Sequence, residues 1–190
     1  MPNHPTRDDA LALLHKYTKS DSLRRHALGV EQAMLKMAEK YGGDLYEWGI
    51  VGLLHDFDYE MYPTIEEHPY KGNEILKEKG YPESICKAIM GHATYTGVPR
   101  DTDMAKALFS VDELTGFIFA VTYVRPSRSI FEVQPKSVKK KLKQKSFAAS
   151  VVREDIFLSV EELEIDMTEH IQFVIDALAE KAEVLGLAGD

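Results

Sequence analysis

The strongest constraint on the fold is the spacing of the apolar residues, which recur every three or four positions along most of the chain. This period matches one face of an α-helix, whereas a half-buried strand alternates every second residue. The clearest case follows Ser22, with apolar residues at Leu23, Ala27, Val30, Met34, Met37, Ala38 and Tyr41. Gly42 and Gly43 come next, and glycine accepts the left-handed conformation that ends many helices. The sequence therefore predicts an all-α protein.

Capping signals predict where several helices begin and end. Thr6 to Asp9 fits a capping box, and Asp44 precedes a helix that carries an apolar run to His55. A further helix is expected from about Glu66 to Lys79, because Gly80 can end it. The N-terminal part of the chain is therefore predicted to be a series of helices joined by short loops.

Two more helices are predicted in the middle of the chain. Pro82 opens the first, in which Ile85, Ile89 and His92 lie on one face. The second begins near Asp103 and has a long apolar side. The segment between them, 93–102, reads as a loop.

The C-terminal part begins with an unusual charge pattern. Residues 136–145 hold six lysines and no acidic residue, which indicates a solvated helix face or a local anion site. Ser159 to Glu162 fits a capping box that would start a long C-terminal helix reaching Leu178. No internal repeat or low-complexity linker divides the chain, so residues 1–190 are predicted to form one compact domain with an added C-terminal helix.

Composition narrows the possible partners. The formal net charge of −8 argues against nucleic-acid binding, and no apolar run is long enough to suggest a membrane partner. The sole cysteine, Cys86, cannot form an internal disulfide and is expected to be a small buried side chain. We therefore expect a cytoplasmic protein; the composition leaves its oligomeric state open.

Chemistry is indicated by histidines and aspartates on the apolar faces of the predicted helices. One buried histidine alone is usually a core residue with a satisfied hydrogen bond. An aspartate inside a helix is harder to explain, because burying its charge without a partner costs free energy. A divalent cation removes that cost when carboxylates and neutral imidazoles become its ligands. These positions are His26, His55, Asp56, His68, His92 and Asp112.

In this order, H…HD…H…H…D, the residues resemble the HD-domain superfamily of metal-dependent phosphohydrolases. The resemblance covers about residues 20–130, the predicted metal-binding core, and residues 136–190 lie outside it. It includes His55-Asp56 in GLLHDFD and His92 in MGHAT. It is closest to the six-ligand branch that binds two metals, whereas the simpler branch keeps H…HD…D and one metal. The resemblance implies a helical HD-domain bundle.

The resemblance also implies a ligand arrangement. His26, His55, Asp56 and Asp112 would bind one ion, and His68 and His92 would bind a second, with Asp56 bridging. One or two divalent ions are therefore expected, and iron, manganese or a similar transition metal suits this mixed set of ligands.

Candidate substrate-binding residues lie beyond these ligands. Arg125 and Arg128 resemble a segment in family members that hydrolyse dinucleoside polyphosphates; the alternative is a pair of exposed arginines in a turn. Thr94 and Arg100 follow His92 and could line the mouth of the pocket. Lysines 139–145 could form a rim for anions.

One departure from the family pattern stands out. Many relatives read HDIGK, whereas here Phe57, Asp58 and Tyr59 follow the HD pair and the lysine is missing. If that lysine holds a phosphate or protonates a leaving group, another side chain must replace it. The candidates are Asp58, Glu60, Lys71 and Arg125.

The function expected from the resemblance is hydrolysis of a phosphate ester or anhydride in a small substrate, with a nucleotide favoured. His55 and Asp56 would be catalytic, and a metal-bound hydroxide would attack phosphorus. Two alternatives stay open. One is a di-iron oxygenase with the same ligand pattern, and the other is a nucleotide or metal sensor without turnover.

Overall fold

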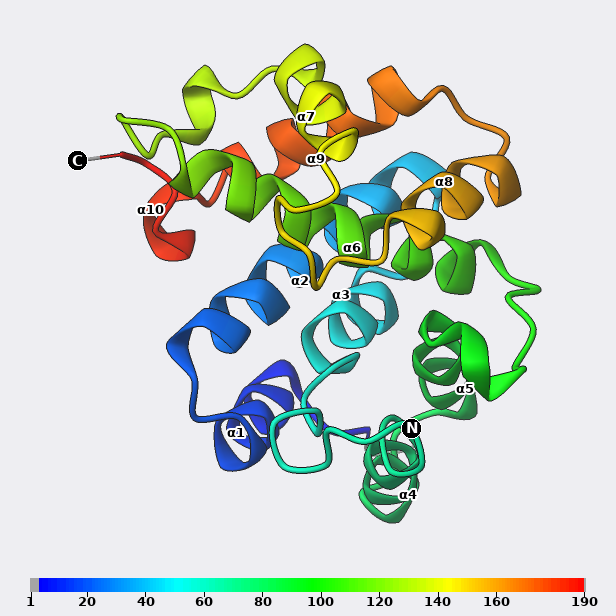
Figure 1. Ribbon diagram of the computed structural model, residues 1–190. Coiled ribbons are helices and arrows are strands. Elements are labelled where there is room, and N and C mark those ends of the chain that lie inside the picture. The colour runs from blue at the N-terminus through cyan, green and yellow to red at the C-terminus, as the bar shows by residue number, and fades with distance from the viewer. Residues whose placement is uncertain (1–3, 190) are drawn as a thin grey trace.

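The computed structural model describes residues 4–189 and confirms the all-α class (Figure 1). Within those residues the only β-type pairing is an isolated bridge between Ser129 and Ala188. Two short 3-10 helices lie at Thr94–Thr96 and Ile130–Glu132. The α-helices are α1 (Arg7–Tyr17), α2 (Asp21–Tyr41), α3 (Leu45–Leu54), α4 (Tyr70–Glu78), α5 (Glu83–His92), α6 (Asp103–Tyr123), α7 (Pro135–Leu142), α8 (Arg153–Glu162), α9 (Met167–Ala179) and α10 (Ala182–Leu185).

The long helices α2 and α6 run through the middle of the molecule, with α3 beside them (Figure 1). Helices α1, α4 and α5 lie on one side of this centre, and α7, α8 and α9 lie on the other. Buried apolar side chains from α1 to α10 form one contiguous cluster. Cys86 belongs to it, as expected, and burial raises the pKa of its thiol to about 11. This packing fixes the central helices between the outer helices, so polar side chains on the central helices have defined positions.

The caps that the sequence predicts for the N-terminal helices are present in the structure. Thr6 and Asp9 form the predicted capping box of α1, and the Asp44 carboxylate accepts from Glu47 N at 2.9 Å at the start of α3. Gly42 ends α2 with φ of +69°, in the left-handed region that favours glycine. These ends fix the lengths of the helices that lead to His55.

The predicted start of the fourth helix is wrong. The structure begins α4 at Tyr70, and residues 65–69 form turns instead of helix. The reason is Pro69, because a residue that precedes proline is driven out of the helical region. His68 therefore lies in a turn and not in the first turn of a helix.

The predicted start of the C-terminal helix is also wrong, although the helix itself is present as α9 and reaches Leu178. Ser159 to Glu162 form the last turn of α8, where the Ser159 hydroxyl donates back to Ile156 O at 2.9 Å. The chain then breaks at Glu164, which has φ of +54°, and Asp166 caps α9. Burial of Ser159 in the core decides against a cap at that position, since an N-cap hydroxyl must face the free amides of a new helix.

The lysine-rich segment is a short helix, α7, with Val138 and Leu142 buried beneath it. Lys139 and Lys140 are exposed, and Lys139 donates to the Thr168 hydroxyl. The segment is thus an amphipathic helix with a solvated basic face. None of the described helices has the length and apolar character to cross a membrane.

Candidate metal centre

The six predicted ligands come together from five segments of the chain. His26 lies on α2, His55 and Asp56 directly follow α3, His68 precedes α4, His92 ends α5 and Asp112 lies on α6. Their ligand atoms form two groups, each within 4.8 Å. The first cluster is His26, His55, Asp56 and Asp112, and the second cluster is Asp56, His68 and His92. Asp56 belongs to both.

Helix ends orient two of the imidazole rings. The Nδ1 atom of His55 donates to Gly52 O at 2.8 Å, and the Nδ1 atom of His92 donates to Ile89 O. Each acceptor lies three residues earlier, among the carbonyls that the end of a helix leaves free. The opposite nitrogen, Nε2, is therefore directed at the carboxylates in both rings.

Short distances connect the donors within each cluster. In the first cluster, Asp112 Oδ1 lies 3.0 Å from His26 Nε2 and 3.1 Å from His55 Nε2. In the second cluster, Asp56 Oδ1 lies 3.2 Å from both His68 Nε2 and His92 Nε2. The Nε2 atoms of His68 and His92 are only 3.3 Å apart. Two imidazole nitrogens that face each other so closely need either a shared proton or a cation.

The charges in the clusters are strongly coupled. Burial lowers the pKa of His55, but the carboxylates of Asp112 and Asp56 outweigh it and raise the pKa to about 10. The pKa of His68 is raised to about 9 in the same way, against burial, by Asp56 and Asp58. Burial raises the pKa of Asp112, but His55 and His26 bring it well below its usual range. Protons on the histidines thus balance the carboxylates, and a cation would do so in their place.

These residues fit a divalent metal. The Nε2 atom of His55 is buried and has no hydrogen-bond partner, although it points at two carboxylates. A coordinated ion would satisfy this atom and the facing nitrogens of the second cluster. Imidazole with carboxylate is a donor set that suits transition metals. The arrangement could bind such ions and present a substrate oxygen to them.

A cavity of about 710 Å³ opens over both clusters. His26, Asp56, His68, His92 and Asp112 line its floor, and His55 lies below the surface. Part of its wall comes from a region that the sequence did not single out. These wall residues are Glu113, Ser150, Val151, Val152 and Asp155.

Three of these wall residues lie in the loop 146–152, which Arg153 holds in place. Its guanidinium donates to the carbonyls of Leu142, Ala148 and Val151 at 3.1 to 3.4 Å. Val152 N donates to Glu113 Oε2 at 3.1 Å, which ties the loop to α6. Burial and the nearby Asp112 raise the pKa of Glu113 to about 8. The wall is thus built from contacts between segments far apart in the chain.

Of the two residues after His92 that were predicted to line the mouth of the pocket, only one does so. Thr94 lines the cavity, as expected of a residue at its mouth. Arg100 does not: it donates to Gly91 O and Glu162 and stacks on the Phe109 ring at 3.6 Å. The side chain that sequence adjacency placed at the mouth therefore joins α5, α6 and α8.

The other basic residues that were predicted to bind substrate also lie outside the lining of the cavity. Lys71 pairs with Glu74 on the surface of α4, and Arg125 pairs with Glu132. Arg128 has φ of +47° in the turn after α6. The lysines of α7 are absent from the lining as well.

Two of the residues proposed to replace the missing lysine form hydrogen bonds elsewhere. Glu60 accepts from Lys19 N at 2.8 Å and Ser20 N at 3.0 Å, at the start of α2. Asp58 is buried and accepts from His68 Nδ1 at 2.8 Å. Neither side chain lines the cavity.

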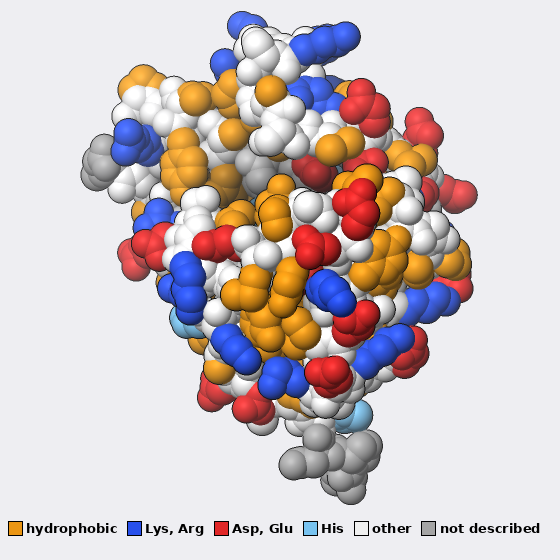
Figure 2. All heavy atoms as spheres, turned by 60° about the horizontal axis from the view of Figure 1, so that its bottom comes forward, with side chains coloured by type: hydrophobic (Ala, Val, Ile, Leu, Met, Phe, Trp, Pro, Cys, Tyr) orange, Lys and Arg blue, Asp and Glu red, His pale blue; other side chains and the backbone are white. Residues whose placement is uncertain are grey.

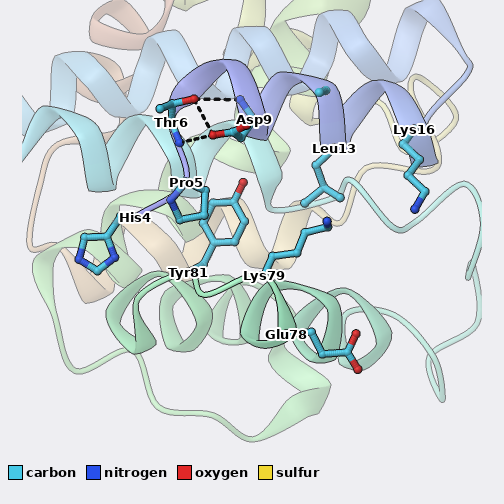
Figure 3. A pocket seen from close by; sticks show the side chains of 10 residues that line it. His4, Pro5, Thr6, Asp9, Leu13, Lys16, Glu78, Lys79 and Tyr81 are labelled. Carbon is cyan, nitrogen blue, oxygen red and sulfur yellow. Dashed lines mark hydrogen bonds between the residues drawn. The ribbon is translucent and has the colours of Figure 1, made fainter. Parts of the chain in front are cut away.

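A second hollow of about 630 Å³ lies between α1 and the end of α4 (Figure 3). Asp9 and Thr6 on its edge bind each other in the capping box, and Lys16, Lys79 and Glu78 surround it. Figure 2 shows this side of the molecule turned toward the viewer, with acidic and basic side chains interspersed around a central group of hydrophobic ones. Neither view shows a concentration of metal-binding or basic groups on this side.

Comparisons with known proteins agree with the geometry. Residues 23–115 match the family model described as HD domain. The chain is 28% identical over 119 residues to a symmetrical bis(5'-nucleosyl)-tetraphosphatase of Staphylococcus aureus. The match covers 55% of this chain and 59% of that protein, so the chain spans about six-tenths of its length. No solved structure gives a significant match.

Proposed function

Because residues 23–115 of this chain form an HD domain, we propose that the protein is a metal-dependent phosphohydrolase. The observation that carries the proposal is the convergence of two clusters of metal-binding side chains that share Asp56 beneath one open cavity. A structural metal site would be closed by four ligands, whereas a catalytic site keeps positions for water and substrate. The open cavity favours the catalytic kind.

The six side chains have proposed roles. His26, His55, Asp56 and Asp112 would hold one divalent ion, and His68, His92 and Asp56 would hold the second. Iron or manganese fits these donors. Bound ions of this kind supply Lewis acidity and a hydroxide nucleophile near neutral pH. Asp56 belongs to both clusters and so fixes their positions relative to each other.

The walls of the cavity have separate roles in the proposal. Thr94 and Ser150 line the cavity, and their hydroxyl groups can donate to phosphoryl oxygens of a bound substrate. Leu23 and Phe109 contribute apolar surface that keeps bulk water from the reacting group. Phosphate would therefore bind at the floor, and the rest of the substrate would extend toward the mouth.

A nucleotide is the proposed class of substrate. Tyr59 and Tyr95 line the cavity and expose 42% and 49% of their surface, so an aromatic ring can stack at its mouth. The Tyr95 hydroxyl donates to His68 O at 2.8 Å, which fixes that ring beside the second cluster. The name of the Staphylococcus aureus relative is consistent with this class.

The C-terminal segment, residues 136–190, is proposed to belong to the same domain as the core. Buried side chains of α9 and α10 join the central apolar cluster, and Ser150 to Val152 wall the cavity. Without this segment the centre would lose one side of its substrate site.

The direct test is turnover of a panel of phosphate compounds by protein loaded with Mn²⁺ or Fe²⁺. The panel contains nucleoside monophosphates, dinucleoside polyphosphates and a simple aryl phosphate. Release of phosphate or nucleotide that disappears in His55→Ala and Asp56→Ala supports the proposal. Absence of turnover with every compound and both metals would refute it.

A further inference from the structure

Asp58 is a buried carboxylate with two hydrogen bonds and no contact with the cavity. It lies in the turn after α3 and is 1% exposed. Oδ1 accepts from His68 Nδ1 at 2.8 Å, and Oδ2 accepts from Gly72 N at 2.8 Å. Both oxygens are therefore occupied by donors from residues 68–72.

The bond to His68 decides which nitrogen of that ring is free. When Nδ1 carries the proton that Asp58 accepts, Nε2 keeps its lone pair in the neutral ring. Nε2 is the atom that lies 3.2 Å from Asp56 Oδ1 in the second cluster. A carboxylate partner also makes the imidazole a stronger base, and hence a stronger ligand, than a backbone carbonyl does.

Among the histidines of the two clusters, His68 differs in this partner. His55 and His92 donate from Nδ1 to backbone carbonyls of their own helices. His68 lies in a turn and has no such carbonyl, so a side chain from another loop supplies the acceptor. The position of His68 therefore depends on Asp58.

The bond to Gly72 fixes Asp58 in turn. Gly72 N lies in the first turn of α4, where amides lack partners within the helix, and Pro69 offers no capping side chain. A Cβ atom on residue 72 would lie 2.7 Å from the Asp58 carboxyl carbon, so only glycine lets the backbone come this close. Asp58 thus caps α4 and positions His68 with one carboxylate.

We propose that Asp58 is a positioning residue that holds His68 with its proton on Nδ1, so that Nε2 is the ligand of the metal in the second cluster. The proposal rests on the metal centre proposed above but not on its reaction. It also gives a role to Asp58, an acidic residue that closely follows the HD pair but does not line the cavity.

Asp58→Asn is the informative variant because an amide offers only one acceptor oxygen. If this oxygen faces Gly72 N, the amide NH₂ meets Nδ1 of His68 and favours the tautomer whose Nε2 carries the proton. Outer-shell substitutions of this kind weaken metal binding by about 10- to 100-fold. Titration of the metal-free protein with Mn²⁺ alone should therefore show such a loss at one of two sites and no change at the other.

Glu60→Gln is the matched control, because Glu60 lies in the same loop as Asp58 and also accepts two hydrogen bonds, from Lys19 N and Ser20 N, but contacts neither cluster. It should leave both affinities unchanged. The proposal is overturned if Asp58→Asn binds two Mn²⁺ ions like the natural protein, or if both sites weaken equally. If the natural protein binds only one ion, the two-metal centre fails as well.

A measurement on the natural protein covers the case in which Asp58→Asn does not fold. Nitrogen-15 NMR of the Zn²⁺-loaded protein reports which imidazole nitrogen of His68 carries hydrogen. A proton on Nδ1 with Nε2 bound to zinc supports the proposal. A proton on Nε2 overturns it, whatever the enzyme does with phosphate compounds.

Discussion

The two clusters share Asp56 but are built in different ways. In the first cluster, His26 and Asp112 project from within the long central helices α2 and α6. In the second cluster, His68 lies in a turn and His92 is the last residue of α5. The first cluster therefore takes two of its four members from the packed interior of long helices, whereas both histidines of the second cluster come from a turn and a helix end.

The clusters also differ in charge. The first contains two carboxylates, Asp56 and Asp112, whereas the second contains only the shared Asp56. Because each carboxylate adds attraction for a cation, the first cluster should bind its ion more tightly. Loss of metal should thus begin at the second cluster.

Asp56→Ala should have the largest effect, since it removes the side chain common to both clusters. Both sites should lose affinity and hydrolysis should fall below detection, as measured by elemental analysis and by a phosphate-release assay. Asp101→Ala is a control, because Asp101 pairs with Lys87 on the surface. Asp56→Ala protein that retains two ions would show that the clusters are independent.

His92→Ala and His26→Ala should separate the clusters. His92→Ala should weaken only the weaker Mn²⁺ site, by more than the roughly 100-fold upper end for outer-shell changes, because it removes a ligand itself. His26→Ala should weaken the tighter site. Calorimetric titration distinguishes the two, and a loss at the same site in both variants would contradict the comparison.

Metal binding should depend on pH in both clusters. With pKa values of about 10 and about 9, His55 and His68 are protonated at neutral pH without metal. An ion must displace these protons, so apparent affinity should rise about tenfold per pH unit for each proton released. Titration with Mn²⁺ in buffers of different ionisation enthalpy counts the protons. Affinity that is constant between about pH 6 and 8 would contradict this.

The stability of the metal-free protein should change with pH in the opposite direction and fall as the pH rises. A histidine whose pKa is raised above 6.5 by folding stabilises the protein fully below that pH, and this contribution is lost as pH rises through about 9 to 10. The Tm of metal-free protein should therefore fall across this range, whereas Mn²⁺-loaded protein should not follow it. Thermal scans with and without metal provide the check.

Arg153→Ala should have the smallest effect, because it acts on the cavity wall and not on the clusters. Loss of its bonds to the carbonyls of residues 142–151 should loosen the wall and raise KM about tenfold, or about 1.4 kcal/mol. Metal affinity should be unchanged, and Lys140→Ala on the exposed face of α7 is the control. A change in metal binding but not in KM would mean that the wall supports the clusters.

The sequence predicted the helices because helix periodicity is a local property, and the same periodicity predicted the burial of some ligands; the arrangement of all six was implied by the resemblance to the HD-domain superfamily. His92 shares a helical face with Ile85 and Ile89, and its burial follows from that periodicity. Asp112 is an acidic residue on the apolar side of a helix, so the sequence pattern alone marks its charge as unusual. Positions of this kind need no long-range information beyond the fact that apolar faces meet.

The cavity wall and the second cluster's support could not be predicted in this way. Arg100 follows His92 closely, yet its side chain is directed to Glu162, which lies 62 positions along the chain. Arg153 fixes the wall through backbone carbonyls, whose positions depend on how the loop folds. Asp58 gave no local sign that it would contact His68 instead of substrate. Contacts across loops are decided by tertiary packing.

The two-metal centre is tested most directly by anomalous diffraction at the manganese edge from crystals loaded with Mn²⁺. We expect two peaks, one among the ligand atoms of the first cluster and one among those of the second, with Asp56 between them. A single peak, or peaks away from His26, His92 and Asp112, would contradict the proposed centre.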